Sequence, residues 1–241
     1  MCSSDLVVVG APVLCDPYSK NYYHFSLEMI PRLRYFDRAD EAPVIMTSDS
    51  LARPFQRDLA TRTLAARRVV PLQGGARVRD PVLAHDSLSE EGVLWLRKAA
   101  GLLARPGGRR LYIRRNATGT RATPGGGLSE SAGLCALLRD FGFETVDFGN
   151  GGQSVAAQVA MLDGAGLVLS AHGAALTNLA YLDRGAKVIE VFGERTRNAC
   201  FMHLAAIVGF EYRALFSSAY DDGLDMVVDL DELREVLSAL A

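Results

Sequence analysis

The sequence predicts an α/β protein with mainly parallel sheets, and two observations lead to that prediction. Short β-branched runs alternate with segments of helical periodicity along the 241 residues, which is typical of βαβ units. The runs 167–169 and 188–191 are nearly continuous in apolar residues, as expected for central strands covered on both faces. The predicted strands are residues 6–9, 43–46, 68–70, 111–114, 144–147, 166–170, 187–192 and 212–215.

Amphipathic segments between the later strands predict the helices that cover them. Residues 129–140 place leucines on one stripe and are followed by Gly142, a typical stop signal. Ser154 is suited to cap the next helix. The predicted helices are residues 129–140, 154–163, 196–209 and 229–241.

The chain divides most naturally near residues 101–108, a small and flexible stretch containing Pro106, Gly107 and Gly108. We therefore expect two domains, residues 1–103 and 104–241. The first is short for a full Rossmann domain, which leaves a truncated or fragmentary first half open. A second flexible stretch, residues 117–127, predicts a mobile loop at the end of a strand.

Composition excludes several classes of protein. With 49% apolar and 22% charged residues the chain is neither disordered, collagen-like nor a coiled coil. Its net charge of −2 gives no basic footprint for nucleic acid. The four cysteines are scattered without metal-ligand spacing, so we expect reduced core thiols of an intracellular protein.

No segment of the sequence reads as a membrane span or a signal peptide. The longest uncharged run, residues 164–182, contains His172, Asn178 and several glycines, whereas a span needs about 20 predominantly apolar residues. The start of the chain lacks a cationic region before an apolar stretch. We therefore expect a cytoplasmic protein and leave peripheral membrane association open.

In open α/β sheets, ligands bind beyond the carboxyl ends of strands, so the residues that follow each strand are the candidates. Arg114 and Arg115 end one predicted strand. Strand alternation sends their side chains to opposite faces, so at most one is expected to reach a ligand directly unless the strand has already ended. They are either solvated charges at a strand end or fork donors for phosphate oxygens.

A turn of small residues follows the strand 166–170. Gly173 and Ala174 let a phosphate approach the backbone, and a helix starting near Ala174 would present amide N–H groups to it. His172 lies in the mouth of this turn, and a structural donor and a ligand-binding group are equally good interpretations of it. Glu190 places a carboxylate in an apolar strand; ribose hydroxyls or a neighbouring arginine would satisfy it equally well.

The first half contains one further candidate pair. Asn21 can cap a helix that Pro31 must end or kink. His24 and Glu28 are four residues apart and share a face of that helix. Spacing alone favours a simple ion pair; if the face borders a cleft, Glu28 could orient His24 as a general base.

Familiar catalytic motifs are missing. The sequence contains no P-loop, no G-x-S-x-G and no H-E-x-x-H, and residues 149–152 lack the third glycine of a dinucleotide fingerprint. Simple hydrolase and P-loop functions therefore have little support.

The sequence resembles glycosyltransferase family 61. The resemblance rests on residues 22–33 (YYHFSLEMIPRL), 111–115 (LYIRR) and 170–178 (SAHGAALTN), and continues through 188–190 toward Tyr212. It implies a GT-B architecture of two Rossmann-like domains facing a cleft, with the nucleotide sugar held chiefly by the second. It also implies inverting transfer of a hexosyl or pentosyl group, commonly from a UDP sugar, to a glycan-type or other hydroxyl acceptor in polysaccharide biosynthesis, without a metal or other cofactor.

This resemblance implies a role for each candidate residue. His24, oriented by Glu28, is the candidate base. The candidate diphosphate site comprises Arg114, Arg115, His172, Gly173 and Ala174, and the residues expected to hold the nucleotide or its ribose are Asn178 and Glu190.

The sequence leaves two other functions open. An NAD-dependent oxidoreductase would be stabilised by NAD and not by UDP. A non-catalytic carbohydrate- or nucleotide-binding protein would bind UDP without transferring or hydrolysing a donor.

Overall fold

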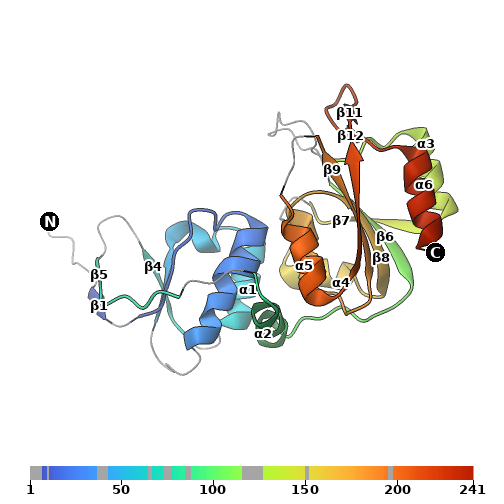
Figure 1. Ribbon diagram of the computed structural model, residues 1–241. Coiled ribbons are helices and arrows are strands. Elements are labelled where there is room, and N and C mark those ends of the chain that lie inside the picture. Colours follow the sequence, from blue (N-terminus) through green and yellow to red (C-terminus); the bar gives the residue numbers. More distant parts are fainter. Residues whose placement is uncertain are drawn as a thin grey trace. The chain divides into compact units, whose positions relative to one another are not determined.

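The computed structural model describes residues 7–9, 11–36, 43–64, 67–72, 77–84, 88–115, 127–149, 152–194 and 198–240. The chain forms two compact units, Met1–Leu102 and Leu103–Ala241, drawn in Figure 1. Several sequence-based predictions lie outside the described residues: the loop 117–127 apart from Gly127, together with Cys2, Leu6, Thr196 and Ala241.

The second unit is built on a five-stranded sheet whose strands are all parallel. Its order is β10-β9-β8-β6-β7. The strands are β6 (Arg109–Arg114), β7 (Phe143–Asp147), β8 (Ala165–Ala171), β9 (Lys187–Gly193) and β10 (Glu211–Ser217). A small antiparallel pair, β11 (Ala219–Tyr220) and β12 (Met226–Val227), follows β10.

Helices cover both faces of this sheet (Figure 1). One face carries α3 (Ala132–Asp140) and α6 (Leu230–Ala239). The other carries α4 (Val155–Met161), the 3-10 helix η5 (Ala174–Tyr181) and α5 (Cys200–Val208). Leucines of α3 and α6 pack in one buried cluster with side chains of the strands, which is why strands β8 and β9 read as continuously apolar.

The strand order reverses within the sheet between β6 and β8. From β6 the chain steps outward to β7, then returns past β6 to continue through β8, β9 and β10 on the other side. Such a reversal leaves a crevice at the carboxyl ends of the two strands that flank it, the usual position of a ligand in this class of sheet. The residues that follow β6 and β8 are therefore the first to consider as a site.

The first unit contains smaller parallel sheets. Strands β2 (Val13–Leu14), β3 (Val44–Thr47) and β4 (Val69–Leu72) form one, and β1 (Val7–Val9) pairs with β5 (Arg77–Arg79). The helices are the π-helix η1 (His24–Met29), the 3-10 helices η2 (Ile30–Phe36) and η3 (Ser48–Leu51), α1 (Pro54–Thr63) and α2 (Glu90–Ala100). Buried apolar side chains, among them Phe25, Ile30, Phe55 and Leu96, form the core.

The predicted α/β class with parallel sheets is confirmed, and three local expectations need correction. Helical backbone continues through Pro31 to Phe36, with the change from π to 3-10 geometry falling just before the proline. Helices α1 and α2 were not predicted, although Ser89 caps α2 and Gly101 ends it in a left-handed conformation. The described cysteines are not core thiols, because Cys135 is exposed and Cys15 and Cys200 are only half-buried.

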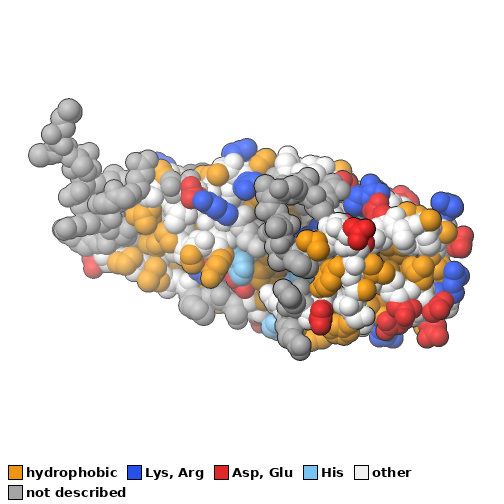
Figure 2. Space-filling model, turned by 90° about the horizontal axis from the view of Figure 1, so that it is seen from above, with side chains coloured by type: hydrophobic (Ala, Val, Ile, Leu, Met, Phe, Trp, Pro, Cys, Tyr) orange, Lys and Arg blue, Asp and Glu red, His pale blue; other side chains and the backbone are white. Residues whose placement is uncertain are grey.

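The helices and the charged side chains of the surface were also compared with what a membrane or a nucleic acid would require. In the described part of the chain, no helix has both the length and the apolar character needed to cross a membrane. On the face drawn in Figure 2, basic and acidic side chains are interspersed over the second unit.

Candidate functional site

The structure brings Arg115 and His172 together at the reversal point of the five-stranded sheet. Arg115 directly follows β6 and His172 directly follows β8. Nη1 of Arg115 donates a hydrogen bond to the backbone carbonyl of His172, with an N···O distance of 2.5 Å. A guanidinium and a histidine thus lie at the carboxyl ends of the two strands where a ligand is expected.

Strand register explains why Arg115, and not Arg114, reaches this turn. Ile113 pairs with Ser170 across β6 and β8, and side chains two residues further along each strand point to the same face. Arg114 points to the other face, where its guanidinium donates two hydrogen bonds of 2.6 and 2.7 Å to Glu130. This pairing raises the pKa of Arg114. The structure does not bring Arg114 to the turn.

Gly173 provides the space that Arg115 occupies. A Cβ at this position would lie 2.9 Å from Nη1 and 3.0 Å from Cζ of Arg115, closer than real Cβ contacts. Ala174, half-buried, begins the helix η5. The first amide groups of a helix lack acceptors within it and favour an anion. A phosphate at this position would meet a guanidinium and backbone N–H groups together.

The ring of His172 is held on several sides. Nδ1 lies 2.5 Å from Oε1 of Glu190. Phe192 stacks on the ring with centroids 5.2 Å apart and planes at 27°, and Phe201 packs against it at 5.5 Å. The side chain of His172 keeps 17% exposure, so these neighbours do not enclose it completely.

The carboxylate of Glu190 is bonded to side chains other than the arginine that the sequence suggested. Its side chain is 0% exposed, and its second oxygen, Oε2, accepts a hydrogen bond of 2.5 Å from the hydroxyl of Tyr212. Burial, followed by the contact with Glu190, raises the pKa of Tyr212. Neither a ribose nor an arginine is needed to satisfy this carboxylate, because a histidine and a tyrosine do so.

Asn178 is also fully buried. Its amide nitrogen donates to Oε1 of Gln158 at 2.8 Å and to the carbonyl of Ala175 at 3.1 Å. The bond to Gln158 ties η5 to α4, so any effect of Asn178 on a nucleotide would act through the position of this helix.

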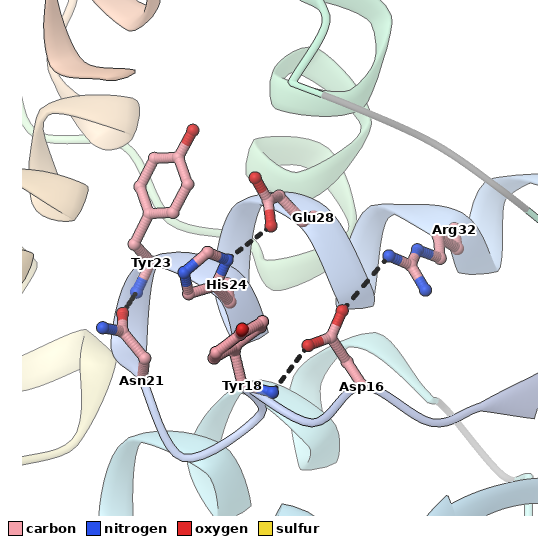
Figure 3. Close-up of polar contacts among 7 residues, drawn as sticks. All are labelled: Asp16, Tyr18, Asn21, Tyr23, His24, Glu28 and Arg32. Carbon is pink, nitrogen blue, oxygen red and sulfur yellow. Dashed lines mark hydrogen bonds and ion pairs between the residues drawn. The ribbon is translucent and has the colours of Figure 1, made fainter. Parts of the chain in front are cut away.

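The first unit places His24 and Glu28 in direct contact, as their spacing predicted. Nδ1 of His24 lies 2.6 Å from Oε2 of Glu28, and the two side chains are 31% and 28% exposed. Both belong to η1, and π-helical turns frequently occur at functional sites. Asn21 accepts a hydrogen bond from the amide of Tyr23 at 2.9 Å, which orders the start of this segment (Figure 3).

Tyr18, which lies against His24, and Asp16, which is bonded to Tyr18, were not predicted from the sequence. The ring of Tyr18 lies 5.1 Å from that of His24. Asp16 accepts a hydrogen bond of 2.8 Å from the amide of Tyr18 and one of 3.4 Å from Arg32 (Figure 3). Asp16 and Arg32 are distant in sequence, and no local pattern joins them, so sequence inspection had no signal for this contact.

Comparison with known families decides the identity. The family model described as Glycosyltransferase 61 matches residues 22–189, more than half of the 241 residues. The chain belongs to glycosyltransferase family 61. The match contains the pair His24 and Glu28, the residues Arg114 and Arg115, and the turn at His172. A search of curated proteins finds no match.

For a member of family 61, the structure supplies two groups of polar side chains suited to sugar transfer, one in each unit. Within the described residues, no cluster of three or more His, Cys, Asp or Glu side chains is arranged to hold a metal ion. The two groups are Arg115 with His172 in the second unit and His24 with Glu28 in the first.

Proposed function

We propose that this glycosyltransferase transfers a sugar from a UDP-linked donor to a hydroxyl group of a glycan-type acceptor, with inversion at the anomeric carbon. Family membership supports the general activity. The observation that carries the donor side is the meeting of Arg115, His172 and Gly173 at the reversal point of the sheet.

The reaction places specific demands on this site. The acceptor oxygen forms a bond to the anomeric carbon while the bond from that carbon to the diphosphate breaks, and the electron pair leaves on the diphosphate. Negative charge grows on the leaving group, so donors aimed at it lower the barrier. The guanidinium of Arg115 and the first amides of η5 are such donors.

The acceptor hydroxyl must lose a proton during the same step. We propose that His24 accepts this proton and that Glu28 orients the ring of His24. Direct attack from the side opposite the leaving group inverts the anomeric centre. Tyr18, which is 64% exposed and lies beside His24, is suited to contact the acceptor sugar through its ring face.

The remaining parts of the proposal come from the family resemblance. They are a GT-B arrangement in which two Rossmann-like domains face a cleft, a reaction without a metal ion, a hexosyl or pentosyl donor, and a role in polysaccharide synthesis.

A panel of nucleotides and nucleotide sugars tests the donor side through ligand-induced shifts in melting temperature. We expect UDP and a UDP sugar to stabilise the protein. Arg115→Ala should remove most of the shift, and Arg114→Ala is the matched control because its side chain pairs with Glu130 on the other face. Stabilisation by NAD and not by any nucleotide sugar would contradict the proposal.

Product analysis tests the chemistry. Incubation with the stabilising donor and candidate acceptors should yield a product whose anomeric configuration, read by NMR, is opposite to that of the donor. Binding of UDP without transfer or donor hydrolysis would instead indicate a non-catalytic binding protein.

A further inference from the structure

The carboxylate of Glu190 lies inside the second unit and is held from both neighbouring strands. It is 0% exposed, and a buried carboxylate is costly unless its oxygens receive hydrogen bonds. His172, after β8, contacts one oxygen and Tyr212, on β10, contacts the other. All three side chains lie on the face that carries α5, because Ser170 and Ala214 both pair with Glu190 in the register of the sheet.

The two contacts determine which ring nitrogen of His172 carries a proton. Burial and the contact with Glu190 raise the pKa of Tyr212, so its hydroxyl keeps its proton and donates to Oε2. With Oε2 occupied by that donor, the second oxygen, Oε1, lies 2.5 Å from Nδ1 of His172, and an N–H at Nδ1 is the donor that suits a carboxylate oxygen. Nδ1 is therefore the protonated nitrogen that faces inward.

The other ring nitrogen, Nε2, is left for a ligand. Among the described residues, no hydrogen bond reaches Nε2, and the side chain is 17% exposed. Phe192 and Phe201 limit rotation of the ring, and Arg115 holds the carbonyl of the same residue. Together with Glu190, these three neighbours of His172 set the direction of Nε2.

We propose that Glu190 and Tyr212 are positioning residues for His172: they orient its ring so that Nε2 donates a hydrogen bond to the diphosphate of the sugar donor, and the Glu190 carboxylate balances the charge of the doubly protonated ring. This inference rests on the proposed function, since it takes the diphosphate as the ligand of the turn. It gives Glu190 a role through His172 in place of a contact with ribose.

NMR of protein whose 4 histidines carry a 15N label tests the inference. The signals that disappear in His172→Gln are those of His172. In the nucleotide-free protein we expect a proton on Nδ1 of His172. On addition of UDP we expect both ring nitrogens to be protonated. In Glu190→Gln, which preserves the volume of the side chain and an oxygen for Nδ1, the second protonation should be lost and the affinity for UDP should fall about tenfold.

Tyr212→Phe is the second variant, and it keeps the test valid if Glu190→Gln fails to fold. It removes one donor from Glu190 and should weaken UDP binding roughly two- to tenfold. Glu211→Gln is the matched control: Glu211 lies on β10 beside Tyr212, is exposed and pairs with Arg213 at 2.9 Å. It should leave both the His172 signals and UDP binding as in the parent protein.

The outcomes separate the inference from the function on which it rests. A nucleotide-free protein whose His172 carries its proton on Nε2 alone would overturn the positioning role, whatever the protein binds. Unchanged UDP affinity and ring protonation in both variants would overturn it as well. If no nucleotide binds the parent protein, the proposed function fails, and the diphosphate fails as the ligand of His172.

Discussion

The guanidinium of Arg115 fills the space directly against Gly173: a Cβ at that glycine would lie 2.9 to 3.1 Å from its Nη1, Cζ and Nε atoms. Since Gly173 has an extended backbone, with φ of 166°, its requirement for glycine is steric. The absence of a side chain at 173 is what allows the arginine to lie across the turn.

Gly173→Ala should therefore displace Arg115 without disturbing the backbone. We expect UDP binding to weaken about tenfold, equivalent to ~1.4 kcal/mol, with the melting temperature nearly unchanged. Calorimetric titration measures the first quantity and thermal unfolding the second.

Gly108→Ala is the control for this substitution, because nothing lies within 4 Å of the Cβ it would add. Equal UDP affinity in the two alanine variants would contradict the steric link between Gly173 and Arg115.

Substitution of the candidate base should separate catalysis from donor binding. His24→Gln removes the group that takes the proton from the acceptor hydroxyl. General-base catalysis contributes roughly 10²- to 10⁴-fold to a rate. We expect kcat to fall within that range while UDP affinity stays the same, because the donor contacts lie in the second unit. Retained turnover in His24→Gln would remove His24 from the mechanism.

Glu28→Gln should lower kcat less than His24→Gln does. The contact of 2.6 Å between Glu28 and His24 orients the ring, and a glutamine can keep a hydrogen bond to it while losing the negative charge of the carboxylate. A steady-state comparison of the two variants measures this order, and a larger loss in Glu28→Gln would assign the base to Glu28 itself.

Stability at alkaline pH should reflect Tyr112 and Tyr212. Burial is the largest cause that raises the pKa of each phenol. In the unfolded chain a tyrosine ionises near pH 10, so above about that pH the folded state binds more protons than the unfolded state. The free energy of unfolding must then fall as the pH rises.

Urea unfolding between neutral pH and strongly alkaline pH measures this slope. Tyr212→Phe removes one of the two phenols, so the free energy of unfolding should fall less steeply with pH, by at most the contribution of one proton. Tyr112→Phe should have the same effect. A slope unchanged in both variants would mean that these phenols ionise in the folded protein.

The buried pair of Asn178 and Gln158 should contribute to stability as a unit. Asn178→Leu leaves Oε1 of Gln158 without the donor at 2.8 Å, and an unsatisfied buried polar group costs about 1–3 kcal/mol. Adding Gln158→Leu replaces both partners by apolar groups and should recover part of that loss. A double-mutant cycle in urea tests this, and strictly additive losses would argue against the coupling.

Local sequence patterns were sufficient for the features that depend on a few neighbouring residues. Alternation of apolar runs and amphipathic segments predicted the parallel sheets, because the period of a strand or helix is a local property. Spacing of four predicted the contact of His24 with Glu28. Alternation along β6 predicted that Arg114 and Arg115 point to opposite faces, but it could not say which of them lies beside the turn at His172.

Tertiary structure decided the contacts made between strands. The register of β6 against β8 selected Arg115, and the register of β8, β9 and β10 gave Glu190 a histidine and a tyrosine where the sequence suggested ribose or arginine. The contact of Asp16 with Arg32 likewise joins residues from separate segments. Sequence determines which side chains each face of a strand presents, but strand order and register determine which of them meet, and both are set by packing of the whole sheet.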